Sequence, residues 1–117
     1  MKEYMLVYIN DGSDECMHDK TDAEMKAAMD RWATWMANLQ QQDRLVSGGS
    51  PLVPGGQRMN ASGVVTDIAA AEFKELVSGY SIIRAESPEE AVALTKDCPI
   101  FDSPGCITEI REVMQLG

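Results

Sequence analysis

The chain has 117 residues, with 10 Lys and Arg against 19 Asp and Glu, so its formal net charge is −9. This length suits one domain, residues 1–117, whose core is large enough to fold without a disulfide or a structural metal. The acidic balance argues against nucleic acid and against anionic membrane surfaces as partners, because both attract concentrated basic side chains.

The first predicted strand, over residues 4–9, is apolar at every position. A strand with one wet face would alternate apolar and polar side chains, so this strand should be covered on both faces. A polar loop over residues 10–20 follows. Thr21 and Glu24 then have the spacing of a capping box, which predicts a helix from about residue 22 to about residue 42.

This helix carries one apolar stripe at steps of three and four residues, made of Met25, Ala28, Met29, Trp32, Trp35, Met36 and Leu39. We expect the stripe to pack on the sheet, with Trp32 and Met36 as its anchors. The two tryptophans could instead wall a cleft or form a platform for an aromatic substrate, and methionines beside them would make that wall adaptable.

The rest of the chain predicts five strands, over residues 44–51, 57–60, 63–66, 79–85 and 107–114. Ser87 and Glu90 repeat the capping-box spacing, with Pro88 at the first helical position, and the helix ends before Pro99. Residues 67–76 are ambiguous between helix and loop.

The predicted order is strand, helix, strand, an inserted hairpin, strand, helix and strand. Without the insert this is the split βαβ, ferredoxin-like βαββαβ plan of an α+β domain. Two helices can cover only one face of the sheet, so the other face of residues 4–9 needs a partner. A second copy of the chain is the simplest one, and we therefore predict a homodimer.

The cysteines are Cys16, Cys98 and Cys106. They lack CxxC spacing, so we expect neither a zinc site nor a redox dithiol, and no other metal or cofactor. The loop before Cys106 would allow a bridge to Cys98. Otherwise we expect reduced thiols in a cytoplasmic protein, because the start of the chain lacks a signal-peptide pattern and no apolar run approaches the roughly 18 residues of a membrane span.

Eight segments share their order and spacing with one known family: MKEYML at 1–6, GGSPL at 48–52, VTD at 65–67, AEFKEL at 71–76, GYSII at 79–83, SPEEA at 87–91, CP at 98–99 and EIREV at 109–113. On these segments the chain resembles the YCII-related family and, within it, the branch named for a DGPF-type motif. The resemblance implies a dimeric α/β-barrel of the ferredoxin-like kind, without one established reaction.

The resemblance also bears on partners and chemistry. Some relatives occur beside, or fused to, sigma-factor-like regulators, which implies such a protein as a candidate partner. Others resemble small-molecule enzymes with a His–Asp pair whose histidine lies in the first helix, but this chain has no histidine there. The Asp-Gly-Pro-Phe stretch of the branch is replaced by Asp67-Ile68-Ala69-Ala70.

Two residues are candidates for proton transfer. His18 is the one histidine of the chain, and its ordinary pKa lies near neutrality, so it could act as a general base unless it is a solvated loop residue. Asp67 could act if burial or the neighbouring Glu72 raised its pKa. The alternative is that Asp67 closes a turn through its backbone.

Four residues are candidates for binding, namely Glu72, Lys74, Tyr80 and Arg111. Lys74 could contact an oxyanion, and Arg111 could hold a carboxylate through two hydrogen bonds unless it pairs with an acid on its own strand. We expect Asp67, Glu72, Lys74, Tyr80 and His18 to border a cleft between the sheet and the insert, residues 52–77.

We therefore predict a small-molecule-binding or regulatory accessory domain. One alternative is a cofactor-free enzyme with lyase-type or isomerase-type acid–base chemistry on a small aromatic or carboxylated metabolite. Another is an interaction module for a sigma-factor-like regulator. Binding is favoured over catalysis because it needs no group that exchanges protons near pH 7.

Overall fold

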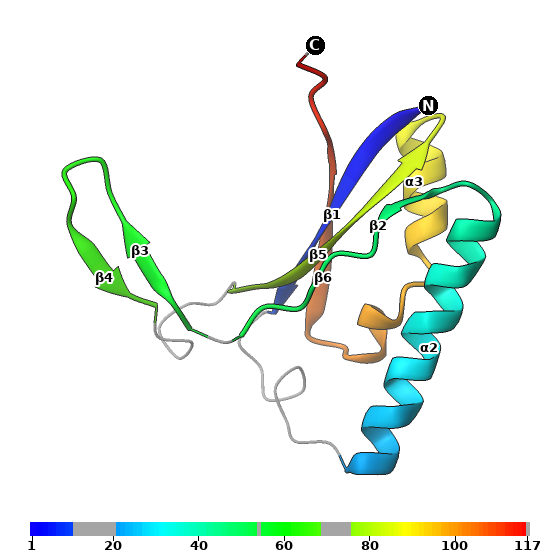
Figure 1. Ribbon diagram of the computed structural model, residues 1–117, viewed down its shortest axis with the longest axis horizontal. Coiled ribbons are helices and arrows are strands. Elements are labelled where there is room, and N and C mark those ends of the chain that lie inside the picture. The colour runs from blue at the N-terminus through cyan, green and yellow to red at the C-terminus, as the bar shows by residue number, and fades with distance from the viewer. Residues whose placement is uncertain (11–20, 54, 69–75, 117) are drawn as a thin grey trace.

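The computed structural model describes residues 1–10, 21–53, 55–68 and 76–116. Its elements follow one another as β1 (Lys2–Asn10), α2 (Asp22–Gln41), β2 (Leu45–Ser47), β3 (Gln57–Met59), β4 (Val65–Asp67), β5 (Leu76–Ala85), α3 (Pro88–Thr95), the 3₁₀ helix η2 (Pro99–Asp102) and β6 (Cys106–Glu112) (Figure 1). Four strands form one antiparallel sheet in the order β2-β5-β1-β6, while β3 pairs with β4 separately. This α+β arrangement is consistent with the predicted ferredoxin-like plan with an inserted hairpin.

The two α-helices begin where the capping signals predict. The Thr21 hydroxyl accepts from the Glu24 N–H at 3.1 Å, and the Glu24 carboxylate accepts from the Thr21 N–H at 3.2 Å. At α3 only half of the box forms, because the Glu90 carboxylate accepts from the N–H of Glu86 rather than from that of Ser87. No helix in the described part of the chain is long and apolar enough to cross a membrane.

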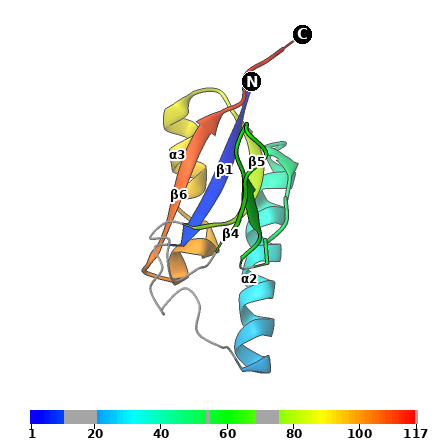
Figure 2. The ribbon, with the colours of Figure 1, turned by 90° about the vertical axis from the view of Figure 1, so that its left-hand side faces the viewer.

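The described helices all lie on one side of the four-stranded sheet, and Figure 2 looks onto the face that they leave uncovered. Along β1, Tyr4, Leu6 and Tyr8 are buried beneath the helices, whereas Met5 and Val7 point to the opposite face and are half-buried. The prediction that this strand is covered on both faces is therefore confirmed on the helix face alone. What covers the other face stays a prediction.

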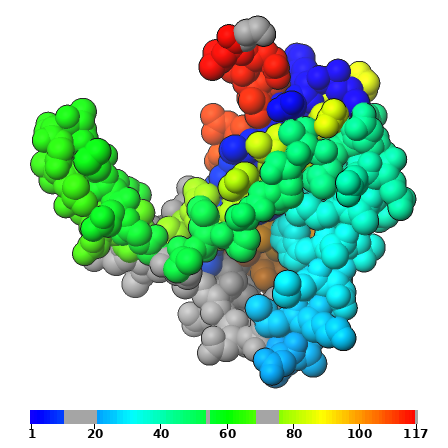
Figure 3. Space-filling view, in the orientation of Figure 1, coloured from blue at the N-terminus to red at the C-terminus, as the bar shows by residue number. Residues whose placement is uncertain are grey.

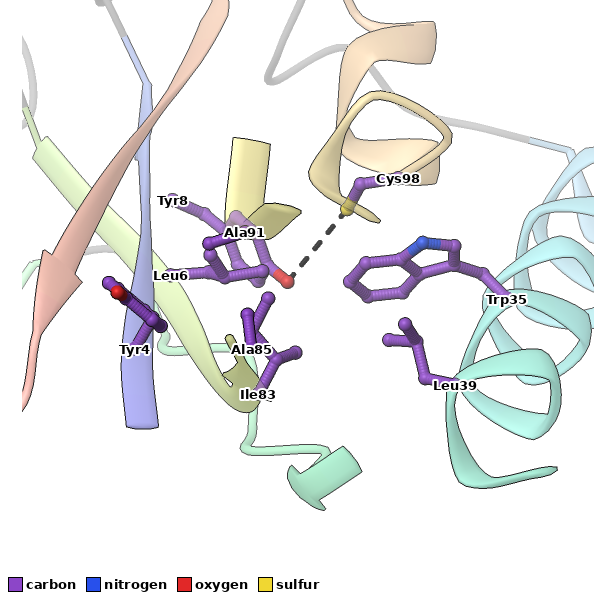
Figure 4. Close-up of a cluster of buried hydrophobic side chains, with 9 residues drawn as sticks. All are labelled: Tyr4, Leu6, Tyr8, Trp35, Leu39, Ile83, Ala85, Ala91 and Cys98. Atoms are coloured by element: carbon purple, nitrogen blue, oxygen red, sulfur yellow. Dashed lines mark hydrogen bonds between the residues drawn. The ribbon is translucent and has the colours of Figure 1, made fainter. Parts of the chain in front are cut away.

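The core joins β1 and β5 to both helices through Tyr4, Leu6, Tyr8, Trp35, Leu39, Ile83, Ala85, Ala91 and Cys98 (Figure 4). Trp35 and Leu39, one helical turn apart, anchor α2, and the Trp35 indole also donates to the Leu94 carbonyl oxygen at 3.2 Å. The predicted anchors, Trp32 and Met36, are only half-buried. The apolar stripe is wider than the surface on which α2 packs, so Trp32 and Met36 lie at the edge of that contact and not in the core.

Residues 57–67, the β3–β4 arm, project away from the rest of the domain (Figures 1 and 3). Every residue of the two strands is exposed. The Asn60 side chain holds the connecting turn by accepting from the N–H groups of Ser62 and Val64 at 2.9 and 3.0 Å. An isolated two-stranded hairpin is only marginally stable in water.

The two described cysteines are in different oxidation states, and they do not form the bridge that their spacing would allow. Cys98 is a free, buried thiol, whereas Cys106 is disulfide-bonded, so these two do not pair. The expectation that all the thiols are reduced is therefore wrong at Cys106. Cys16 lies outside the described residues.

Candidate functional site

A pocket of about 370 Å³ lies between α2 and the sheet, which is within the usual range for small-molecule sites. Its lining comes from α2, β1, β5, η2 and the segment after β2, through Tyr8, Met29, Trp32, Met36, Gly48, Gly49, Ser50, Pro51, Ser78, Gly79, Tyr80, Ser81 and Ile100. Among these described residues there is no acid, lysine, arginine or histidine. The pocket is therefore apolar and aromatic, with a few hydroxyl groups.

Two glycines bring the segment after β2 against β5 and so shape the rim. Gly49 has a φ of +69°, and a Cβ there would overlap the carbonyl oxygen of Tyr80 and lie 2.6 Å from its carbonyl carbon. A Cβ at Gly79 would lie 3.0 Å from the carbonyl oxygen of Ser50. A hydrogen bond also joins the two segments, because the Leu52 N–H donates to the Ser78 carbonyl oxygen at 2.8 Å.

Trp32 forms part of the pocket wall. Its ring meets the ring of Tyr8 edge to face, with centroids 5.4 Å apart, and meets that of Trp35 in the same way at 5.8 Å. Such pairs contribute about 0.5–1.5 kcal/mol each beyond burial and fix the orientation of the ring. Of the two roles that the sequence allows for Trp32, sheet anchor or cleft wall, the structure therefore favours the cleft wall.

The floor is a chain of hydrogen bonds whose direction follows from its last member. Ser81 must donate its hydrogen to the Gly48 carbonyl oxygen, at 2.9 Å, because a carbonyl only accepts. Tyr8 must then donate to Ser81 at 2.8 Å, and the Cys98 thiol must donate to Tyr8 at 3.8 Å (dashed in Figure 4). The polar hydrogen of each of these three side chains is therefore already donated within the chain of hydrogen bonds.

The two ionisable groups of this hydrogen-bond chain, the Tyr8 hydroxyl and the Cys98 thiol, stay protonated at neutral pH. Burial raises the pKa of Tyr8 well above its ordinary value of 10.0, although the hydrogen bond from Tyr8 to Ser81 opposes the shift. Burial likewise raises the pKa of the Cys98 thiol above 9.0. Neither group is therefore a base or a thiolate nucleophile near pH 7, and the floor is neutral.

These raised pKa values predict that the protein loses stability in alkali. In the unfolded chain Tyr8 and Cys98 ionise near 10.0 and 9.0, whereas in the folded chain they keep their protons to higher pH. The unfolded state then binds fewer protons, so the free energy of unfolding falls as pH rises past about 9. Urea denaturation between pH 7 and 11 should show a smaller fall for Tyr8→Phe than for the wild type. An equal fall in both proteins would contradict this assignment.

Tyr8→Phe and Tyr4→Phe make a matched pair on one strand. We expect Tyr8→Phe to destabilise the protein by about 1–3 kcal/mol, because it leaves buried Ser81 and Cys98 groups without their partner. The Tyr4 hydroxyl is buried without a hydrogen-bond partner among the described residues, so Tyr4→Phe should be neutral or stabilising. Chemical denaturation measures both, and equal losses would contradict the hydrogen-bond chain.

The structure places three of the sequence-predicted site residues, and they lie apart. Tyr80 lines the pocket, but it precedes Ser81 on β5, so its side chain leaves the sheet on the opposite face. Asp67 is exposed on the β3–β4 arm, where the Gln57 amide donates to its carboxylate at 3.5 Å. Arg111 is exposed on β6 and forms an ion pair with Glu109 at 3.3 Å. Neither Asp67 nor Arg111 lines the pocket.

His18, Glu72 and Lys74 lie outside the described residues, so their predicted roles, and the cleft that they would border, stay predictions. The sequence reasoning missed Tyr8 and Ser81 as site residues. The glycine-containing segment 79–83 could have located Ser81, because it contributes to the lining, whereas Tyr8 lies in an apolar strand that gives no such signal. Within the described ranges no group of three acids, cysteines or histidines could hold a metal ion.

Comparison with known proteins gives one assignment. A search of the curated proteins finds no significant match. The family model of the YCII-related domain matches residues 1–116, a span that includes every element described above. The chain therefore belongs to the YCII-related domain family.

Proposed function

We propose that this chain is a small-molecule-binding domain whose site is the pocket between α2 and the sheet. The observation that carries the proposal is the pocket itself, about 370 Å³ with a wall of tryptophan and methionine over a hydroxyl floor. Ligand sites are typically concave and mostly apolar, with a small number of placed polar groups. The regulatory role that such binding would serve stays a prediction.

Binding fits the pocket better than catalysis does. A cofactor-free acid–base enzyme needs a group that gains and loses a proton near pH 7. Within the described lining, Tyr8 is held protonated by its burial, and the charged candidates Asp67 and Arg111 are elsewhere. The enzyme alternative therefore depends on His18, Glu72 or Lys74, about which the described residues say nothing.

Thermal denaturation with a panel of neutral and carboxylated indoles and naphthalenes tests the proposal, because a ligand of the native state raises its apparent stability. Met29→Asp and Met25→Asp provide a matched pair. Both methionines are exposed on α2, but only Met29 lines the pocket. Met29→Asp should abolish the ligand-induced shift, and Met25→Asp should preserve it. A shift that survives in both variants would place the ligand elsewhere.

The helix-free sheet face supports a second proposal, that the domain works as a homodimer. Ile110 packs against the core, so Ile107 lies on the opposite face of β6, beside the face that Met5 and Val7 occupy on β1. Packing two such faces together would form the dimeric α/β barrel that the family resemblance implies, and the exposed β3–β4 arm could add to the contact. Obligate interfaces of this kind exceed about 2,000 Å² in total.

Sedimentation at micromolar concentration tests the dimer against the protomer mass of 12.8 kDa. Ile107 and Val92 are exposed to nearly the same extent, 46% and 44%, but Val92 lies on α3. We expect Ile107→Lys to give a monomer and Val92→Lys to remain a dimer. A wild-type monomer would exclude the proposal.

Three finer assignments are also proposals. Membership of the DGPF-motif branch is supported by Asp67 and the Ala71–Leu76 stretch in the sequence alone. A cytoplasmic location was predicted from the sequence, but disulfides are rare in cytosolic proteins, so the disulfide at Cys106 does not support it. A sigma-factor-like partner rests on the family resemblance.

A further inference from the structure

The lining of the pocket constrains the charge of its ligand. Its described residues include no cationic side chain, and the whole chain carries a net charge of −9. A carboxylate or phosphate that entered would lose its hydration without gaining an ion pair from the described lining. The pocket therefore disfavours anions.

The hydrogen-bond chain of the floor constrains the polar group of the ligand. The hydrogens of Cys98, Tyr8 and Ser81 are all used within the chain, which leaves only oxygen lone pairs to offer. The Ser78 hydroxyl is also used, because it donates to the Tyr8 carbonyl oxygen at 3.3 Å. Ser50 stands exposed at the rim, where water competes for its hydroxyl. Of the two floor residues that line the pocket, Ser81 is fully buried, whereas Tyr8 keeps 5% of its surface exposed.

The wall constrains the shape of the ligand. Trp32 is held edge to face by its aromatic neighbours, and Met29 and Met36 line the pocket beside it on α2. Aromatic rings and polarizable sulfur atoms make favourable contacts with a planar aromatic molecule. An aliphatic ligand would gain the burial of apolar surface but not these directional contacts.

Building on the proposed function of the pocket, we infer that it selects neutral aromatic molecules that donate a hydrogen bond to the Tyr8 hydroxyl oxygen, and that it rejects anionic ones. An N–H or O–H donor is the one polar group that the floor accepts without breaking a bond of its own. A ligand that carries only acceptors would find no hydrogen on the floor to accept, and it would leave the Tyr8 lone pair without a donor.

Three probes of one ring system separate these requirements. Indole is neutral and donates through its N–H, 1-methylindole is neutral without a donor, and indole-2-carboxylate keeps the donor but adds a negative charge. Isothermal titration calorimetry of the full chain should give an affinity for indole about fivefold higher than for 1-methylindole. Indole-2-carboxylate should bind at least about tenfold more weakly than indole.

The outcomes distinguish this inference from the function on which it rests. If none of the probes binds, the proposed small-molecule site is itself wrong. If indole-2-carboxylate binds as tightly as indole, the pocket is a ligand site but the charge selectivity is wrong. If 1-methylindole binds as tightly as indole, the donor requirement is wrong.

Variants of the floor test the atom that accepts the hydrogen bond. Tyr8→Phe should remove the preference for indole over 1-methylindole, whereas the matched Tyr4→Phe, outside the pocket, should retain it. If Tyr8→Phe does not fold, Ser81→Ala provides a second test, because the Tyr8 hydrogen then loses its acceptor and can be donated to a ligand. Binding of benzofuran, which has an acceptor and no donor, should rise about fivefold in Ser81→Ala. No rise would assign the selectivity to another group.

Discussion

Gly49→Ala should destabilise the protein by about 3–5 kcal/mol and remove ligand binding at the pocket. The added Cβ meets the backbone of Tyr80, on the strand that forms the floor, rather than the end of a flexible side chain. The segment after β2 must therefore move away from β5, and the rim of the pocket moves with it. The positive φ of +69° adds the strain of a left-handed backbone conformation.

Gly63→Ala is the matched control for this prediction. Gly63 also has a positive φ, +82°, but a Cβ there would meet no atom within 4 Å. Its cost should be the backbone strain alone, about 1–2 kcal/mol. Urea denaturation of both variants separates strain from collision, and equal losses would show that the approach of Gly49 to Tyr80 does not shape the fold.

Trp35→Ala should cost about 3–5 kcal/mol, the largest loss among the aromatic side chains of α2. Trp35 is only 5% exposed, and its indole N–H joins α2 to the end of α3. Truncation would leave a cavity in the core and an unsatisfied carbonyl oxygen at Leu94. Because Trp32 is half-buried, Trp32→Ala should cost only about 1–2 kcal/mol while removing the pocket wall.

Denaturation and indole binding, measured on both tryptophan variants, check this division of roles. Trp35→Phe is the control, because it keeps most of the packed volume and removes the hydrogen bond alone, at about 1 kcal/mol. If Trp32→Ala proved the more destabilising variant, Trp32 would be the anchor that the stripe first predicts, and its role as a pocket wall would be wrong.

Local signals in the sequence predicted most of the fold. Thr21 and Glu24 fixed the start of α2, and its predicted end differs from the observed one by a single residue. The strand over residues 44–51 was predicted too long, because Gly48 and Gly49 end its regular pairing after Ser47. The short helix η2, which begins at Pro99, is not predicted by the sequence, since it covers only four residues and leaves no periodic pattern.

The candidate site was harder to predict because it depends on how the elements pack. Trp32 and Trp35 occupy the same stripe, and only the rotation of α2 against the sheet decides that Trp35 enters the core. Tyr8 and Ser81 lie 73 positions apart in the chain, so their hydrogen bond leaves no local signal. The sequence suggests charged residues such as Asp67 as site candidates because their side chains can carry chemistry, whereas the described lining of the pocket is neutral.

One measurement tests the central claim, that the pocket beside Trp32 binds a small molecule. The two tryptophans give separate indole N–H resonances in a ¹H–¹⁵N spectrum of the labelled protein, and unlabelled indole can be titrated against both. We predict a saturable shift of the Trp32 resonance, because its ring lines the pocket, and little change in that of Trp35, whose N–H is bound to Leu94. If the Trp32 resonance stays fixed at millimolar indole, or only that of Trp35 moves, the pocket is not the binding site.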